Sequence, residues 1–499
     1  MSLSTMTLVR SFVLASAAVL CAACGGGAKF PVSTSLSEGP DPRPFTAGAP
    51  DAPPVAKDSP RPLPWKARTF KPPTERRLSN GIRVVLAPRR DFPTAMVLFV
   101  LDRGATAAPP GVAQLYGRAL HGDSDAYDAD EASTYLHYVG ATVYPVVTDD
   151  SVILQVSALA PLLPSALSRA APMFASPHFD AKSLDRARAS FTDDDADAPA
   201  RIARRTLRAS LYLSPHPYGR PASLVSAADV ASVKRDALAS FRDMFLTTER
   251  VHVIATGDFE PESLVRSLES LLAKIPRKAA ASAPPIPNGS ASCNGAITIV
   301  DRPGSVQSSI AIGWPSVGAA DPDRAALEVM SAATGGWLSS RLNLTVRKEL
   351  GASYGVHASL ATLRDGGTLE LTSAVDTPKT AEALSGILRE TDRLRTEALS
   401  EDELETAKTK ALIGDDASSS RSLAYRLAHA AAEGLSAAHV VQHAAHVDAL
   451  GADDVKTVAE KWLAPEKRCV VIVGDASIIG PAISGLGIGR VEVARRASR

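Results

Sequence analysis

Several features that mark specialised protein classes are scarce or missing in this 499-residue sequence. Lysine plus arginine and aspartate plus glutamate number 54 each, so no excess charge points to nucleic acid or to an anionic membrane surface. Four cysteines are too few for a disulfide framework, and their spacing excludes a thiolate metal cluster. What is present, 45% hydrophobic and 22% charged residues, is ordinary globular composition. At this length the chain is expected to split into at least two domains.

The N-terminus has the layout of an export signal. Arg10 is followed by the apolar run SFVLASAAVLCAA, which is too short to span a bilayer. Small residues precede Cys24, as in a bacterial lipoprotein signal, although Cys21 departs from the usual leucine near the cleavage site. We therefore predict a lipoprotein-type signal peptide over residues 1–24 with lipidation at Cys24; a plain cleaved signal is the alternative. The proline-rich residues 25–73 are typical of a tether.

Alternating and continuous apolar runs predict the elements of a first domain over residues 74–278. LSNGIRVVLAP, TAMVLFVLDRGA, SVILQVSAL and VHVIATGD are typical of strands. GVAQLYGRAL (111–120), ADEASTYLHYVGA, residues 181–210 and RDALASFRDMF are typical of helices. Because strands occur in adjacent pairs, a doubly wound parallel sheet is disfavoured.

The order of elements then starts again after a linker at 279–296, AAASAPPIPNGSASCNGA. Residues 297–478 read as strands, helices and a last strand KRCVVIVGD, followed by a tail at 479–499. Residues 235–258 and 452–475 share the order helix, connector, β-branched strand and Gly-Asp. We predict an α+β protein of two homologous domains, each a mostly antiparallel or mixed sheet covered by helices. Whether Cys293 and Cys469 pair is open.

Several short stretches, in order, resemble the insulinase/pitrilysin-type zinc metallopeptidases, the family of the mitochondrial processing peptidase. They are LSNGIRVVL, GVAQLYGR, SPHPYGRP, PGSVQSSIAIGWP, TGGWLSSRLNLTVRKELGASYGV and EDELETAK. The resemblance runs from about residue 74 to 478 and is most specific over 335–356. It implies two homologous α+β domains that pair with a second such molecule or half around a peptide, and zinc held by an inverted H-x-x-E-H motif.

The resemblance also implies that this zinc motif is lost. The positions of the two histidines and the glutamate carry Gln114, Arg118 and Gly117, respectively, and the distal glutamate falls near Asp193 or Asp194. Glutamine is a poor zinc ligand, glycine cannot act as a base, and arginine keeps its charge. Two unit charges about 4 Å apart repel by about 4 kcal/mol at an effective dielectric of 20, and a dication roughly doubles that figure. We therefore predict no catalytic residue and no metal in this chain.

Two histidine patterns leave metal binding open elsewhere. His121, with Asp193, Asp194 and Asp195, could rebuild a site next to the lost motif; the alternative is a helix-end histidine and a solvated turn. His439, His443 and His446 fall at i, i+4 and i+7 on one helical face, where they form either an adventitious metal site or a surface or packing stripe.

Arg347 and Tyr354 are retained from the family pattern. In the family, an Arg and a Tyr at this spacing hold the substrate backbone opposite the zinc; the alternative is a structural pair in which Arg347 bridges a helix end to a carboxylate. Gly351 is expected to end the preceding helix in the left-handed conformation, so that Tyr354 begins a strand. Gly335 and Gly336 form either a flexible glycine-rich loop or a helix stop.

Three functions follow from these patterns. The first is a non-catalytic subunit that binds peptide through Arg347 and Tyr354 and pairs with an active, zinc-bearing insulinase-family subunit. It would be lipid-anchored on the periplasmic side of the bacterial envelope, with the outer membrane as the expected membrane. The second is a non-enzymatic scaffold or peptide-binding lipoprotein that keeps the peptidase fold. The third, a self-sufficient metallopeptidase, is disfavoured by the lost motif. The only cofactor expected is zinc, in the partner subunit.

Overall fold

A computed structural model of the chain describes residues 71–192, 197–279, 293, 295–414 and 419–494. These residues all belong to one compact unit, 62–499. The predicted signal peptide with Cys24, nearly all of the predicted tether, and Asp193 to Asp195 lie outside the described residues. Within the part that is described, none of the helices combines the length and the apolar character that crossing a bilayer requires.

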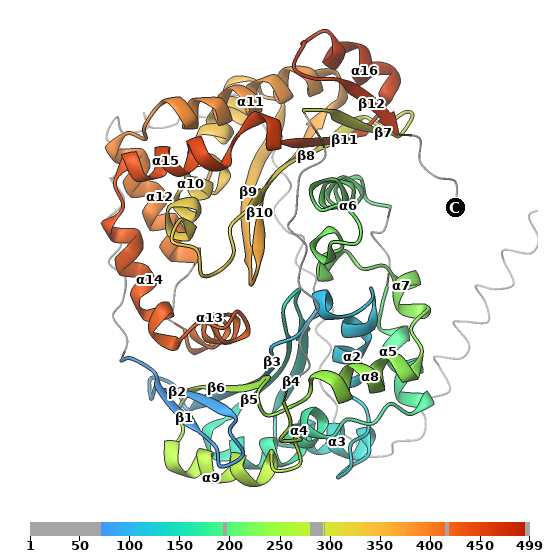
Figure 1. The fold of residues 1–499 in the computed structure, drawn as a ribbon, viewed down its shortest axis with the longest axis vertical. Helices are drawn as coiled ribbons and strands as arrows, with labels where there is room; N and C mark the ends of the chain where they lie inside the picture. The colour runs from blue at the N-terminus through green and yellow to red at the C-terminus, as the bar shows by residue number, and fades with distance from the viewer. Residues whose placement is uncertain (1–70, 193–196, 280–292, 294, 415–418, 495–499) are drawn as a thin grey trace, which may run out of the picture. The chain divides into compact units, whose positions relative to one another are not determined.

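The N-terminal half builds a six-stranded mixed sheet in the order β1-β2-β6-β3-β5-β4 (Figure 1). Its β2–β6 pair is parallel and the other pairs are antiparallel. The strands are β1 (Thr74–Arg77), β2 (Arg83–Pro88), β3 (Thr94–Leu101), β4 (Thr142–Val147), β5 (Val152–Leu159) and β6 (Val251–Gly257). The helices are α2 (Val112–Ala119), α3 (Ala129–Tyr138), α4 (Leu163–Ala175), α5 (Ala181–Ala189), α6 (Pro199–Leu211), α7 (Ala227–Ala231), α8 (Arg235–Phe245) and α9 (Pro261–Leu271), with short 3₁₀ turns η1 (Ala105–Ala107), η2 (Ala160–Leu162), η3 (Pro217–Gly219) and η4 (Ala222–Leu224).

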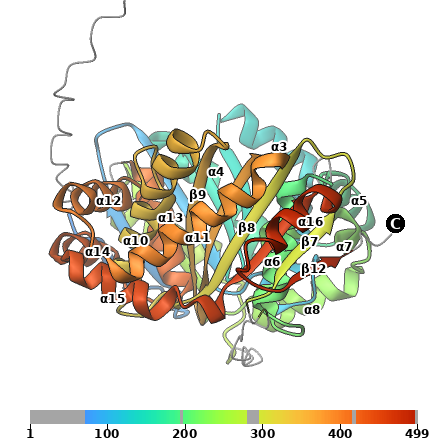
Figure 2. The same cartoon turned by 90° about the horizontal axis from the view of Figure 1, so that it is seen from above.

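The C-terminal half builds a second six-stranded sheet in the order β12-β7-β11-β8-β10-β9. Its strands are β7 (Ile297–Asp301), β8 (Gln307–Ser316), β9 (Ser353–Leu363), β10 (Gly366–Asp376), β11 (Cys469–Gly474) and β12 (Val491–Ala494). The helices are α10 (Arg324–Gly335), α11 (Thr380–Thr396), α12 (Glu401–Gly414), α13 (Ser420–Ala432), α14 (Ala437–Ala449), α15 (Ala452–Trp462) and α16 (Ala476–Ser484), with the π-helix η5 (Asn343–Glu349) and the 3₁₀ turns η6 (Thr377–Lys379) and η7 (Pro465–Lys467). Seen from above, α11 and α16 lie across one face of this sheet (Figure 2).

The two sheets repeat one topology, which confirms the predicted α+β class. The order β2-β6-β3-β5-β4 in the first corresponds to β7-β11-β8-β10-β9 in the second. The predicted internal match is therefore reproduced in space, because α8 and β6 occupy the same place in the repeat as α15 and β11. The sixth strand differs: β1 pairs antiparallel with β2, whereas β12 pairs parallel with β7. β12 lies within the residues 479–499 that were expected as a tail, and it extends the C-terminal sheet.

Each half also sends one helix onto the sheet of the other half. The apolar side of α6 packs on β8 and β11, where Leu207 and Leu211 join Ala311 and Val471 in one buried cluster. Helix α13 packs on β3 and β6, where Leu427 lies in one buried cluster with Leu98 and other side chains. Figure 1 shows α6 against the C-terminal sheet and α13 against the N-terminal one. These two helices make the halves one packed unit.

The run at 181–210, expected as one helix, is two. Helix α5 ends at Ala189 and α6 begins at Pro199. Proline fixes its own φ, lacks an N–H and disfavours helix in the residue before it, so it suits a helix start and not an interior. The break frees α6 to leave the N-terminal half and reach the other sheet.

Candidate functional site

The residues aligned with the zinc motif all lie on α2, most of which is buried. Gln114 and Gly117 are buried, whereas Arg118 is half-buried. Apolar side chains on the same helix, Leu115 and Tyr116, are fully buried in the N-terminal core. The helix is thus held firmly in the N-terminal core, and its polar positions differ from a metal site in three separate ways.

Gly117, at the position of the catalytic base, leaves no room for a side chain. A Cβ built on Gly117 would overlap Cγ2 of Val147, which reaches over from the edge strand β4. A glutamate could enter this position only if Val147 moved. The space that the side chain of a catalytic glutamate would need is therefore occupied by Val147.

Arg118, at the position of the second ligand, contacts an aromatic ring. Its guanidinium carbon lies 5.4 Å from the centroid of the Phe191 ring, a cation–π distance. A fixed positive charge here opposes a divalent cation electrostatically. The residues on α2 therefore do not fit zinc.

Gln114, at the position of the first ligand, is 5% exposed, and within the described ranges neither its amide nitrogen nor its amide oxygen has a hydrogen-bond partner. Asp194, at the expected distal ligand position, lies outside the described residues together with Asp193 and Asp195. His121 is exposed, just beyond the end of α2. In the described part of the chain, no group of three histidine, cysteine, aspartate or glutamate side chains could hold a metal ion.

The three histidines of α14 do not share one environment. His446 is exposed, whereas His443 is buried and its Nε2 lies 2.8 Å from Oε2 of Glu328 on α10. Burial lowers the pKa of His439. At least His443 is therefore a packing residue in a polar cluster between α10 and α14, as the packing interpretation expects.

Arg347 and Tyr354 lie on either side of a tight turn. Arg347 is in the π-helix η5, Gly351 has φ +53° after it, and Tyr354 is the second residue of β9. The predicted left-handed glycine is confirmed. Tyr354 is 92% exposed. The expectation of a structural bridge finds no support, because within the described residues the exposed Arg347 side chain makes no ion pair or hydrogen bond.

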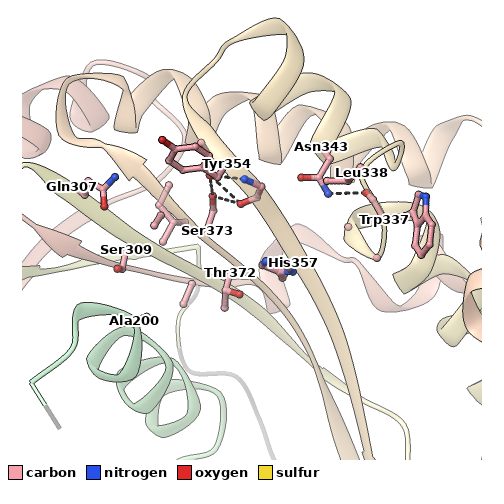
Figure 3. A pocket seen from close by; sticks show the side chains of 17 residues that line it. Ala200, Gln307, Ser309, Trp337, Leu338, Asn343, Tyr354, His357, Thr372 and Ser373 are labelled. Carbon is pink, nitrogen blue, oxygen red and sulfur yellow. Dashed lines mark hydrogen bonds between the residues drawn. The ribbon is translucent and has the colours of Figure 1, made fainter. Parts of the chain in front are cut away.

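Tyr354 lines a cavity of about 750 Å³, which Figure 3 shows from close by. Strands β8, β9 and β10 form its wall, the end of α10 and the following loop form one rim, and Ala200 of α6 lies opposite. The lining residues are Ala200, Gln307, Ser309, Ile310, Ala311, Gly335, Gly336, Trp337, Leu338, Asn343, Ser353, Tyr354, Gly355, His357, Thr372, Ser373 and Ala374. None of these described residues is an aspartate, glutamate, lysine or arginine. The cavity is thus built for an uncharged group.

Hydrogen bonds fix the rim of this cavity. Buried Asn343 donates from Nδ2 to the carbonyls of Trp337 and Val356, at 2.8 and 3.1 Å, and its Oδ1 accepts the Val356 amide at 2.8 Å. Gly335 is the last residue of α10, where a Cβ would lie 2.8 Å from the Ala358 nitrogen. Of the two roles open for Gly335 and Gly336, the structure has the helix stop. It presents Trp337 and Leu338, 50% and 64% exposed, at the cavity's edge.

Two features of the structure were not predicted. Cys293 and Cys469 form a disulfide that joins the segment before β7 to β11. Buried Arg208 of α6 forms an ion pair with Glu370 of β10, which is 1% exposed. The Nη1 atom of Arg208 also donates to Thr368 Oγ1 at 2.6 Å. The ion pair between Arg208 and Glu370 joins residues from the two halves, 162 positions apart, and no short-range pattern could reveal it.

Comparison with known proteins finds a family match for part of the chain. Residues 232–411 match the family described as the peptidase M16 inactive domain. Proteins called uncharacterized zinc proteases, from Mycobacterium bovis and Mycobacterium tuberculosis, are each 33% identical over 183 residues, 36% of this chain. The matched stretch spans about 40% of the length of each of these relatives.

Solved structures extend the match in fold. A peptidase M16 inactive domain from Pseudomonas fluorescens superposes with a TM-score of 0.73 at 20% identity, covering 81% of this chain and 98% of its own. A protease from Helicobacter pylori superposes with a TM-score of 0.73 at 15% identity, covering 82% of this chain and 100% of its own. Residues 232–411 therefore correspond to a peptidase M16 inactive domain, and the described chain as a whole shares the fold of the two solved structures.

Proposed function

We propose that this chain is a non-catalytic subunit that binds peptide in the cavity of Figure 3 and works beside a separate, zinc-bearing subunit of the same family. The observation that carries the proposal is the cavity beside β9, with exposed Tyr354 on its wall, in a chain whose zinc-motif positions do not fit zinc. The zinc that the family implies is accordingly assigned to the partner.

The position of β9 supports an extended peptide as the ligand. β9 is the last strand of its sheet. Asn343 already pairs with Val356 on this strand, and the other outer backbone groups have no partner strand within the described sheet. An extended peptide can add to such an edge through backbone hydrogen bonds, while its side chains enter pockets beside the strand. The uncharged lining and the exposed Trp337 and Leu338 favour an apolar or aromatic peptide side chain in the cavity.

Fluorescence anisotropy of labelled octapeptides tests the binding half of the proposal. We expect a peptide with a central phenylalanine to bind about tenfold tighter than one with lysine or glutamate there, since tenfold corresponds to about 1.4 kcal/mol. Tyr354→Ala should weaken binding by about tenfold, as an exposed aromatic anchor does. The matched control is Tyr138→Ala, which removes another exposed tyrosine, 87% exposed on α3. Equal losses in the two variants would contradict the proposal.

The partnership is tested by purifying the chain with a zinc-bearing family member encoded beside it. We expect metal-dependent cleavage by the pair and none by this chain alone. Arg347→Ala should lower turnover of the pair without impairing assembly, and Lys348→Ala, which changes the neighbouring exposed cation on η5, is its control. A chain that neither binds peptide nor activates a partner would instead be the scaffold of the second hypothesis.

The proposed location is the periplasmic face of the bacterial envelope, with a lipid on Cys24. The disulfide between Cys293 and Cys469 supports this location, because such bonds persist in oxidising compartments. Mass spectrometry of the mature N-terminus tests it: we expect a diacylated or triacylated cysteine, lost in Cys24→Ser. An unmodified N-terminus in the native protein would remove the anchor from the proposal.

A further inference from the structure

A second cavity, of about 940 Å³, lies at the start of α2, away from Tyr354. Its walls come from the loop before α2, from Gln114, and from the segment that connects α6 to the turns η3 and η4. The lining residues are Ala105, Thr106, Ala107, Ala108, Pro109, Pro110, Gln114, Ala209, Tyr212, Leu213, Ser214, Pro215, His216, Pro217, Gly219, Arg220 and Val225. Alanines and prolines dominate, so most of the wall is apolar and short of donors.

Gln114 is the unusual member of this wall. It is 95% buried, since its exposed fraction is 5%, yet among the residues that the structure describes neither polar atom of its carboxamide has a hydrogen-bond partner. Buried polar groups in native proteins are nearly always paired, and leaving one unpaired is costly. Turning the amide toward the cavity would break no hydrogen bond, because it makes none. The structure therefore holds a donor and an acceptor ready at the cavity wall.

Arg220 is the second polar feature. It is the one charged side chain among the described residues that line the cavity, and it is exposed. Its side chain makes no ion pair or hydrogen bond within the described part of the chain. A guanidinium offers a fork of donors that matches a carboxylate in two-point contact.

We propose that this cavity binds a short apolar peptide that carries a carboxylate, with a backbone amide on Gln114 and the carboxylate on Arg220. A carboxamide and a peptide unit each offer one donor and one acceptor side by side, so they pair at two points. An inorganic anion would leave the donor–acceptor pair of Gln114 half satisfied. A compact cavity of this volume is roughly 12 Å across, the reach of about three extended residues.

Where a catalytic member of the family would place a zinc ligand, this chain would thus hold a peptide amide without cleaving it. The inference goes beyond the proposed function and uses none of the residues around Tyr354. The carboxylate can come from a peptide C-terminus or from an acidic side chain, and the choice of probes separates the two sources.

Isothermal titration calorimetry on the full chain tests the inference with three probes. They are acetyl-Leu-Ala with a free carboxylate, its C-terminal amide, and acetyl-Leu-Asp amide. We expect at least one carboxylate probe to bind about tenfold tighter than the neutral amide. The tighter of the two identifies the source of the carboxylate. Equal affinity for all three probes would overturn the assignment of Arg220.

Two variants assign the contacts. Gln114→Met keeps the volume and removes the unpaired amide, so it should weaken every probe about tenfold while raising the melting temperature by a few degrees. A glutamine with no role in binding would give the stability change alone, and unchanged affinity would overturn the proposal. Arg220→Ala should abolish the preference for a carboxylate, whereas Arg205→Ala, an exposed arginine of α6 outside the cavity, should not. Tyr354→Ala should leave all three probes unaffected, which separates this inference from the proposed function.

Discussion

The two helices that cross between the halves both pack on apolar side chains, and α6 adds a buried ion pair to its contact. Under α13, the contact is made by leucine, alanine and other apolar side chains, with polar contacts such as that from the Tyr425 hydroxyl to Gln155 Oε1, at 2.6 Å, beside them. Under α6, a buried ion pair between Arg208 and Glu370 lies beside the apolar cluster, and Arg204 adds a second contact to Glu370 at 3.2 Å.

The contact of α13 with its sheet (the apolar crossing) and that of α6 (the polar crossing) therefore contribute differently to the fold. The hydrophobic effect has no preferred direction. The apolar contact of α13 therefore contributes to the free energy of folding but does little to fix the position of the helix along the sheet. A buried ion pair adds little net stability against an apolar alternative, because desolvation offsets the attraction. It does fix geometry, because any misplacement of α6 leaves a buried charge unpaired. α6 is also the helix whose ends reach both cavities, through Ala200 at one and Ala209 at the other.

The largest expected effect comes from removing one partner of the buried ion pair between Arg208 and Glu370. Glu370→Ala leaves the Arg208 charge buried and unpaired, and should lower the free energy of unfolding by about 3–5 kcal/mol. The double variant Arg208→Met with Glu370→Leu should recover most of that loss. Urea denaturation measures both. A double variant as unstable as the single one would mean that the pair stabilises on balance, contrary to the comparison.

The apolar crossing should respond as a hydrophobic core does. Leu427 of α13 is 2% exposed, and Leu427→Ala should cost about 3 kcal/mol, within the range for buried leucines. A second substitution should not restore the stability lost in Leu427→Ala. At the Arg208–Glu370 pair, in contrast, replacing the remaining partner should restore most of the loss. Chemical denaturation of the single variant, beside that of exposed Leu159→Ala as a control, gives the number. Equal losses at the two leucines would contradict the burial argument.

A pH effect is expected at the end of α13. Burial raises the pKa of Glu433 from 4.5 to about 7, while Arg324, with Nη1 3.5 Å from Glu433 Oε2, acts in the opposite direction. The folded chain therefore holds more protons than the unfolded chain between about pH 4.5 and 7, so the contribution of Glu433 to stability falls as the pH rises through that window, by at most about 3 kcal/mol. Asp150, Glu328 and Arg364 also act on this carboxyl group.

Glu433→Gln should remove this part of the decline. We expect its free energy of unfolding to vary less between pH 5 and pH 8 than that of the native chain, as measured by urea denaturation at each pH. Identical pH slopes for the two proteins would show that Glu433 does not titrate in this window.

The smallest effect is expected at the polar contact beside α13. Tyr425→Phe removes the hydrogen bond to Gln155 and should cost about 1 kcal/mol. The change keeps the ring and its packing. A loss as large as that of Glu370→Ala would remove the contrast between the two crossings.

Much of the local structure could be read from the sequence. β2, β3, β5, β6 and β11 lie in continuous or alternating apolar runs, and α2, α8 and α10 in periodic ones. β4 was missed, since its sequence TVYPVV carries Pro145, which is tolerated there because β4 is an edge strand. The packing of α13, SRSLAYRLAHAAA, could not be predicted either, because the sheet that it covers belongs to the other half of the chain.

The repeated α+β plan and the replacement of the zinc-motif residues follow from the sequence, since both depend on residue types at short spacing. Three facts came from the fold: Val147 fills the space beside Gly117, Gln114 is buried without a partner among the described residues, and Cys293 pairs with Cys469. The reason is that each of these facts joins residues from different elements, up to 176 positions apart. Periodicity reports which face of an element is buried, but not which distant side chain meets it.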